Sequence, residues 1–293
     1  MVYDAARREV LLFGGYAKAP TGDSLVHPND FWAWNGAMWR RLDAGGPDRP
    51  GGRAVPHLVY DAARQRVVMF GGRSERRGNT TILSDVWEWD GTRWHAVPTA
   101  ATPAILHAVT GYDPARRRVV VYGGLGDAGF SRTLREWDGT RWEIRDTAGP
   151  AGVFAGAAAV TPRGELLITT TIPGGDRDPI PDSSKTWVWT GTSWKAAERG
   201  PPFANLQPTT SAPDGTLYFY QVADRWLREP VMHVRGTDGR WSSFPAPLGR
   251  DPYGAQAAFD AARGRLVIYG GGRASGPIPD ETWELNGQRL FRR

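Results

Sequence analysis

One stretch of the chain decides the fold: Tyr60-Asp61-Ala62-Ala63-Arg64, then Val67-Val68-Met69-Phe70-Gly71-Gly72, then Trp87-Glu88-Trp89-Asp90-Gly91-Thr92-Arg93-Trp94. The apolar run before the double glycine and the alternating Trp-x-Trp run both predict β-strands. The Asp-Gly pair between the tryptophans predicts a hairpin turn. The stretch therefore predicts four antiparallel strands, which we call strand a (ending at residue 60), strand b (67–70), strand c (86–89) and strand d (94–97).

The same template recurs along the chain with a period of about fifty residues, which indicates repeated supersecondary units. Every tryptophan except Trp226 falls on it. The fourth and fifth copies keep the tryptophan hairpin but lack the double glycine. Radial packing buries both faces of such sheets, so we expect an all-β, six-bladed β-propeller with tryptophans between neighbouring blades. The expected single domain has blades at about 1–44, 45–98, 99–147, 148–198, 199–245 and 246–293.

The aromatic-Gly-Gly after strand b, the tryptophan pair of strand c and the tryptophan of strand d resemble kelch repeats. Tyr-Asp-Ala-Ala-Arg followed by Trp-Glu-Trp-Asp-Gly-Thr is similar to the bacterial kelch-repeat proteins, and the resemblance covers nearly the whole chain. It implies a kelch-type propeller and leaves the activity open.

The composition and the motifs of the sequence exclude several kinds of chemistry. The chain has no cysteine, which excludes disulfides, Cys-based metal sites and the copper radical chemistry of galactose oxidase-type kelch enzymes. The sequence contains no Gly-x-Ser-x-Gly, His-Glu-x-x-His or phosphate-loop motif. No apolar run approaches the ~18 residues that span a bilayer, so we expect a soluble protein without a membrane span or cofactor.

The first repeat begins partway through its strand a. Met1-Val2-Tyr3 aligns with Leu58-Val59-Tyr60, so strand a of the first blade is expected to be truncated. A natural N-terminus further upstream explains this, and the alternative is a ring that closes with a three-residue strand. The compartment stays open: secreted or cell-envelope if a signal peptide lies upstream, otherwise cytoplasmic.

The net charge of +5 and the pI near 9.7 raise the question of a polyanion ligand. Most basic residues are arginines in the a–b and c–d turns, where aspartates also occur. We expect these charges to pair within the turns, as exposed pairs that stabilise little. Nucleic acid is therefore not expected, and a polyanion-binding face is the alternative.

The b–c loops and the d–a crossings between blades vary most, which favours their face as the binding surface. Strand a contributes His57, His107 and Gln256, and the spacing of the histidines from Tyr60 and Tyr112 predicts side chains on the same side of their strands. Such polar residues either contact a ligand or bond the adjacent blade. Two histidines without a carboxylate make an incomplete metal shell, so no metal is expected. The candidate ligand-binding residues are Arg53, His57, Arg73, His107, Trp226 and Gln256.

Trp226 lies between Arg225 and Arg228 in the fifth b–c loop. It is either a platform on which a sugar or aromatic group stacks or an anchor packed on its own blade. The sequence thus favours a binding or interaction module for a carbohydrate or a protein. The alternative is a metal-free sugar isomerase, mutarotase-like or lyase-like enzyme using the central pocket. No feature of the sequence indicates an oligomeric state.

Overall fold

The computed structural model describes residues 1–19, 25–42, 48–76, 79–99, 102–126, 128–150, 157–161, 165–170, 184–200, 206–221, 229–246, 248, 254–271 and 281–293. This part of the chain has no helix, and hence none that could cross a membrane. The fold is all-β: six four-stranded antiparallel sheets are the blades of a β-propeller, as the sequence predicts. The chain divides into two compact units, Met1–Tyr112 with Arg117–Thr147 and Asp113–Arg116 with Ala148–Arg293.

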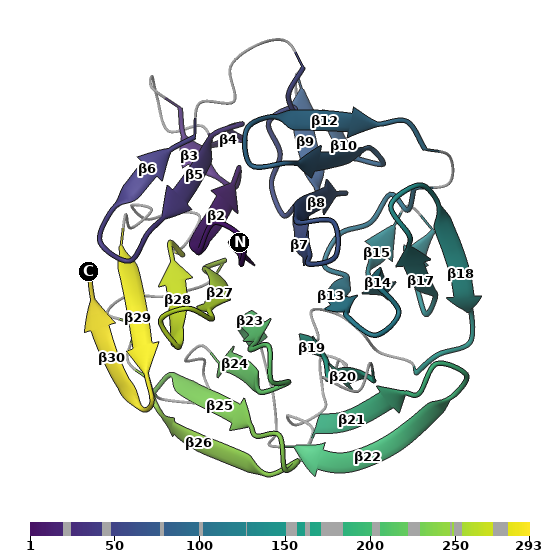
Figure 1. Ribbon diagram of the computed structural model, residues 1–293, viewed down its shortest axis with the longest axis vertical. Coiled ribbons are helices and arrows are strands. Elements are labelled where there is room, and N and C mark those ends of the chain that lie inside the picture. Colours follow the sequence, from purple (N-terminus) through teal and green to yellow (C-terminus); the bar gives the residue numbers. More distant parts are fainter. Residues whose placement is uncertain are drawn as a thin grey trace. The chain divides into compact units, whose positions relative to one another are not determined.

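The first unit carries three blades, each ordered from strand a to strand d (Figure 1). Blade 1 contains β1 (Val2–Asp4), β2 (Glu9–Phe13), β5 (Phe31–Trp34) and β6 (Trp39–Arg41). Blade 2 contains β7 (His57–Asp61), β8 (Arg66–Phe70), β11 (Val86–Trp89) and β12 (Trp94–Val97). Blade 3 contains β13 (Val109–Asp113), β14 (Arg118–Tyr122), β17 (Leu134–Trp137) and β18 (Trp142–Asp146).

The second unit carries three blades with the same order of strands. Blade 4 contains β19 (Ala157–Val160), β20 (Leu166–Thr170), β21 (Ser184–Trp189) and β22 (Trp194–Gly200). Blade 5 contains β23 (Leu206–Ser211), β24 (Leu217–Gln221), β25 (Val231–Arg235) and β26 (Trp241–Pro245). Blade 6 contains β27 (Gln256–Asp260), β28 (Arg265–Tyr269), β29 (Thr282–Asn286) and β30 (Arg289–Arg292).

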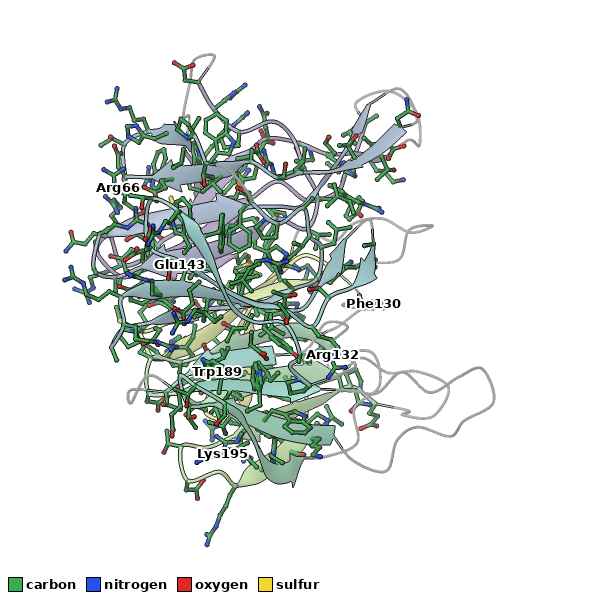
Figure 2. The ribbon with its side chains drawn as sticks, turned by 90° about the vertical axis from the view of Figure 1, so that its right-hand side faces the viewer. Arg66, Phe130, Arg132, Glu143, Trp189 and Lys195 are labelled. Carbon is green, nitrogen blue, oxygen red and sulfur yellow. The ribbon has the colours of Figure 1, made fainter. Side chains whose placement is uncertain are left out.

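Short hairpins extend the b–c connections of the first unit. They pair β3 (Ala17–Lys18) with β4 (Leu25–Val26), β9 (Arg73–Arg76) with β10 (Asn79–Ile82), and β15 (Leu125–Gly126) with β16 (Gly129–Phe130). Figure 2 shows Phe130 and Arg132 on one side of this unit, and Arg66 and Glu143, near the turns, on the other. We call the side with the b–c connections and d–a crossings the loop face, and the side with the a–b and c–d turns the turn face.

The tryptophans occupy the equivalent positions that the sequence predicts. Trp34, Trp89, Trp137 and Trp189 each pair across the c–d hairpin with the tryptophan of strand d. All four are buried, at 3%, 4%, 0% and 4% exposure respectively. The strand bounds expected for the second repeat also agree with β8, β11 and β12 to within a residue.

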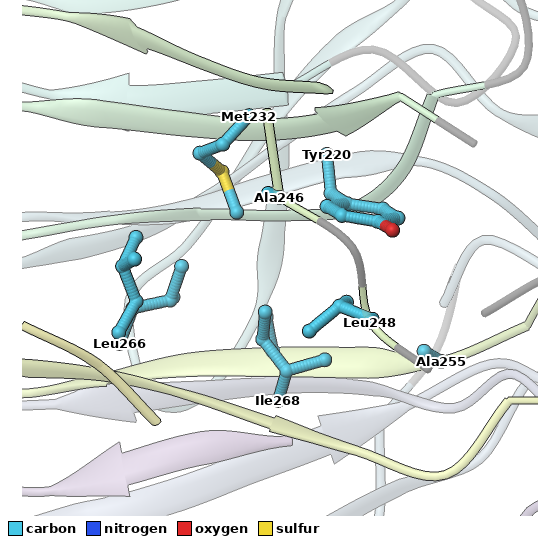
Figure 3. Packing of buried hydrophobic residues seen from close by; sticks show 9 residues of the cluster. Tyr220, Met232, Ala246, Leu248, Ala255, Leu266 and Ile268 are labelled. Atoms are coloured by element: carbon cyan, nitrogen blue, oxygen red, sulfur yellow. The ribbon is translucent and has the colours of Figure 1, made fainter. Parts of the chain in front are cut away.

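Large side chains fill the space between neighbouring blades within each unit. In the first unit the Phe31 ring of blade 1 lies 4.9 Å from both the Trp89 and the Trp94 ring centroids of blade 2. In the second unit Tyr220 and Met232 of blade 5 pack against Leu266 and Ile268 of blade 6 (Figure 3). The prediction that tryptophans fill the space between neighbouring blades is therefore confirmed for blades 1 and 2, whereas between blades 5 and 6 the residues described are tyrosine, methionine, leucine and isoleucine.

The innermost strands of the first unit differ in length. β1 has three residues, all paired with β2, whereas β7 and β13 have five each.

Truncation of Trp89 tests the packing between blades 1 and 2. Trp89→Ala removes a buried indole from contact with Phe31 and leaves a cavity, so we expect unfolding free energy to fall by ~3–5 kcal/mol in chemical denaturation. The matched control is Phe130→Ala, because Phe130 is 61% exposed. Equal effects of the two substitutions would contradict the proposed packing.

Candidate functional site

The a–b turns of four blades share the sequence Asp-x-x-Arg. The pairs are Asp4 with Arg7, Asp61 with Arg64, Asp113 with Arg116, and Asp260 with Arg263. One oxygen of each aspartate accepts the backbone N–H of its arginine at 3.0–3.2 Å. The other oxygen accepts the guanidinium at 2.5–2.8 Å. The expectation that turn charges pair within the turns is confirmed for these four pairs.

The expectation that these are exposed, weak pairs is wrong. The four aspartates are 0–2% exposed, because the turn folds back over the carboxylate that ends strand a. Arg64 and Arg263 in addition bind the buried glutamates of strand c, Glu88 at 2.5 Å and Glu284. Removing one partner of a buried pair costs far more than breaking a surface pair, since the other charge is left unpaired.

The same turns connect blade 1 to blade 2 and blade 2 to blade 3. The Arg7 guanidinium donates to the Asp90 carbonyl of blade 2. The backbone N–H of Ala6 donates to the Tyr60 hydroxyl, and that of Ala63 to the Tyr112 hydroxyl, both at 3.1 Å. The repeated geometry of the turn face in the first unit therefore serves contacts between blades.

The c–d turns are held by their own aspartates. Asp138 accepts hydrogen bonds from the backbone N–H groups of Thr140 and Arg141. Although burial opposes ionisation, hydrogen bonds led by Thr140 lower the pKa of Asp138 to about 2. Asp90 differs from the expected side-chain pairing with Arg93, because the Arg93 backbone N–H donates to it and its side-chain contact at 2.6 Å is with the His95 ring.

On the loop face, the glycines after strand b leave room for the backbone of the d–a crossing to pass close to them. Gly14 has a φ of 64°, and a Cβ there would lie 2.3 Å from the Arg53 carbonyl oxygen. Gly71 repeats this arrangement: its φ is 63°, and a Cβ there would lie 2.7 Å from the Ile105 carbonyl oxygen. Any other residue at Gly14 or Gly71 would collide with the backbone of the crossing, which explains the first glycine of the pair.

Arg53 lies in this crossing and is 1% exposed. Its guanidinium forms two 2.7 Å hydrogen bonds with the Asp85 carboxylate and donates to the Gly51 and Gly71 carbonyls. Burial alone would raise the pKa of Asp85, but the hydrogen bonds and charge of Arg53 outweigh burial, so the pKa of Asp85 is lowered. The contacts that the structure shows for Arg53 are thus internal, and they join the crossing to the b–c connection of blade 2. A contact of Arg53 with a ligand stays a prediction.

Tyr16, His27 and Arg73 form a second group on this face. The Tyr16 ring, 39% exposed, lies 5.1 Å from the His27 ring in an edge-on arrangement. The Arg73 guanidinium carbon lies 5.4 Å from the Tyr16 ring centroid, within the range of a cation–π interaction. Burial and the charge of Arg73 lower the pKa of His27, whereas Glu75 opposes this shift.

His57 and His107 extend this group. The His57 ring stacks on Phe70 at 5.2 Å and is 8% exposed. Burial, followed by the neighbouring His107, lowers the pKa of His57 to about 3. Burial and then Arg73 lower the pKa of His107. We call Tyr16, His27 and Arg73, which are joined by ring contacts, together with His57 and His107, whose charges interact with this group, the loop-face cluster.

The expected alignment of His57 and His107 by strand alternation is wrong. β13 begins at Val109, so His107 precedes the strand, with a φ of 54°. Val55 has the same φ in the equivalent crossing of blade 2. His107 therefore approaches His57 through a bend of the d–a crossing, and the two histidines do not share a strand position.

The structure places the remaining predicted residues elsewhere. Gln256 begins β27 in the second unit, is exposed, and donates to the Ala255 carbonyl. Trp226 lies outside the described residues. Tyr16 was not among the predicted site residues, although its place directly after Gly14-Gly15 puts it at the start of a b–c connection.

Two further histidines have internal partners. His95 pairs with Asp90 as described, and it is about one-third exposed. His233 lies between the Ser243 hydroxyl at 2.7 Å and the Gln221 side-chain oxygen at 2.9 Å, and burial lowers its pKa to about 4. Within the described ranges, no three side chains of His, Cys, Asp or Glu gather in a way that could hold a metal ion.

Comparison of the chain with protein-family models and with curated proteins gives no match. The kelch resemblance therefore rests on the motifs quoted above and on the blade architecture.

Alanine at Gly14 tests the close approach on the loop face. The positive φ and the 2.3 Å distance to the Arg53 carbonyl both oppose a Cβ, so Gly14→Ala is expected to lower the unfolding free energy by more than ~2 kcal/mol. Gly51→Ala is the control, because a Cβ at Gly51 meets nothing within 4 Å. A stability change of Gly14→Ala as small as that of Gly51→Ala, measured by denaturant titration, would refute the contact.

Proposed function

We propose that the protein is a kelch-type β-propeller that acts as a binding module for a carbohydrate or a protein. The proposed binding surface is the loop face, with the loop-face cluster as its contact area in the first unit. Trp226 is proposed as an additional stacking platform, and Gln256 as a further polar contact.

The observation that carries this proposal is the different use of side chains on the two faces. On the turn face, buried aspartates and backbone carbonyls already engage arginines such as Arg7 and Arg64. On the loop face, the cluster combines an exposed aromatic ring, a guanidinium and histidines whose pKa values lie below the ordinary value. Aromatic rings and arginines are the side chains that contribute most to binding interfaces.

The repeat architecture supports the same assignment. Loops on a rigid scaffold carry binding residues more often than the scaffold itself does. The b–c connections of the first unit differ in length, whereas the a–b turns of its blades repeat Asp-x-x-Arg. A surface that differs between blades can recognise a ligand specifically, and a repeated structural turn cannot.

The enzyme alternative needs an acid and a base that reach one bound atom. The Arg53 guanidinium is bound to Asp85 and to the Gly51 and Gly71 carbonyls. No observation therefore favours the isomerase or lyase alternative over the binding module.

A ligand screen followed by substitutions tests the proposal. Mono- and oligosaccharides and a peptide library are screened by thermal shift, since a ligand that binds the native state raises the melting temperature. Titration of each hit is then repeated with Tyr16→Ala, Arg73→Met and Trp226→Ala. Loss of a stacking or cation–π contact is expected to weaken binding by ~1–3 kcal/mol.

Arg93→Ala is the matched control on the turn face, because Arg93 is exposed. We expect unchanged affinity in this variant. A hit whose affinity falls in Arg93→Ala alone, with the three loop-face variants unaffected, would move the binding surface to the turn face and favour the polyanion alternative.

A further inference from the structure

The hairpin of β9 and β10 on the loop face of blade 2 has an open edge. β10 pairs with β9 over four residues, and no other strand in the described part of the chain pairs with it. On the other side of the hairpin, Arg73 of β9 and Ala54 of the d–a crossing exchange two backbone hydrogen bonds of 2.8 and 2.9 Å. The hairpin is thus anchored to the crossing through β9, and β10 is its outer strand.

These two bonds decide which backbone groups of β10 point outward. Ala54 uses both backbone polar groups of Arg73, so Arg73 and its cross-strand partner Ile82 form a pair without mutual hydrogen bonds. Such pairs alternate with hydrogen-bonded pairs along an antiparallel ladder, so Thr80 is oriented like Ile82. The N–H and C=O groups of Thr80 and Ile82 therefore point away from β9, where no described strand lies beside them.

The open edge is accessible and lacks the usual protection of edge strands. The first three residues of β10 are exposed, and Ile82 is half-buried. Proteins commonly protect edge strands with charged residues, with proline or by making them very short. The outer strand of every blade except blade 2 carries a charged residue or a proline, and β4 and β16 have only two residues each. The four residues of β10, Asn-Thr-Thr-Ile, include no charge and no proline.

The surroundings of the edge favour a partner that is both apolar and acidic. Ile82 lies directly opposite Arg73, and the guanidinium carbon of Arg73 lies 5.4 Å from the centroid of the exposed Tyr16 ring. Segment 73–82 contains three arginines and one glutamate. This excess of positive charge attracts an acidic segment and repels a second copy of the same edge.

We propose that an extended segment of an acidic partner protein adds to β10 as the third strand of this hairpin. Its backbone exchanges hydrogen bonds with Thr80 and Ile82, and its apolar side chains pack beside Ile82 and Tyr16. In such complexes the main-chain hydrogen bonds give affinity, and the alternate side chains give specificity. This inference rests on the proposed function, because it identifies the ligand of the loop face as a protein.

The test uses the full chain and two libraries of eight-residue peptides. The acidic library varies Glu, Asp, Val, Ile, Tyr and Thr at every position, and the basic library has Lys and Arg in place of Glu and Asp. Peptides are selected on the immobilised protein, and their dissociation constants are measured by fluorescence anisotropy. Saturable binding is expected from the acidic library.

Two substitutions of Thr80 separate backbone pairing from side-chain contact. Thr80→Pro removes an outward N–H that the hairpin does not use, and Thr80→Ala removes the same hydroxyl but keeps this N–H. The selected peptide is expected to bind at least tenfold more weakly to Thr80→Pro and less than twofold more weakly to Thr80→Ala. Hydrogen exchange of the Thr80 and Ile82 amides is expected to slow when the peptide binds.

The melting temperature of Thr80→Pro reports whether this variant folds. If it does not fold, two N-methylated forms of the selected peptide decide the outcome with the wild type. One form is methylated at the odd positions and the other at the even positions, so each form loses the N–H groups of one strand edge. Strand addition predicts that only one of the two forms loses its affinity.

Equal peptide affinity in the wild type and in a folded Thr80→Pro would overturn strand addition. If that peptide binds more weakly to Tyr16→Ala, the proposed function still stands. Selection from the basic library alone, or a dimer in analytical ultracentrifugation that Thr80→Pro dissociates, would overturn the acidic partner. A saccharide that binds when no peptide does would also overturn this inference alone. Peptide binding that falls in Arg93→Ala and in none of the loop-face variants would contradict the proposed function as well.

Discussion

A propeller blade cannot bury its two faces alone, so the structure depends on how closely each sheet can approach the next. In the first unit this approach is fixed at both ends of the blades. On the turn face, buried Asp–Arg pairs such as Asp61–Arg64 shape the turn that contacts the next blade. On the loop face, Gly14 and Gly71 leave room for the carbonyls of the crossing chain. Between these ends, tryptophan and phenylalanine rings fill the layer.

The structural use of the turn-face arginines explains why a chain with net charge +5 need not bind a polyanion. The arginines of the Asp-x-x-Arg turns are held by carboxylates, so their charge is largely neutralised where it arises. Because the aspartates are buried, salt screens these pairs much less than it screens surface pairs. On the loop face of the first unit, the half-exposed Tyr16 ring lies beside the Arg73 guanidinium instead.

The sequence predicted the six blades, the strand bounds of the second repeat and the buried tryptophans, because these follow from local periodicity. It did not predict that Asp4 and Asp61 are buried, since charged residues in a turn usually face solvent. It placed His107 on a strand, and the positive φ of the crossing became visible only in three dimensions. It also missed Tyr16, whose position depends on the double glycine before it and on Arg73 from the next blade.

Substitution of Arg64 by glutamine tests most directly whether the turn-face arginines hold the structure together. Arg64 binds both Asp61 and Glu88, so the account predicts a loss of ~2–4 kcal/mol in unfolding free energy, with heparin affinity unchanged relative to the wild type. Unchanged stability together with weaker heparin binding in the same variant would show that these arginines form a ligand-binding surface, and would contradict the account.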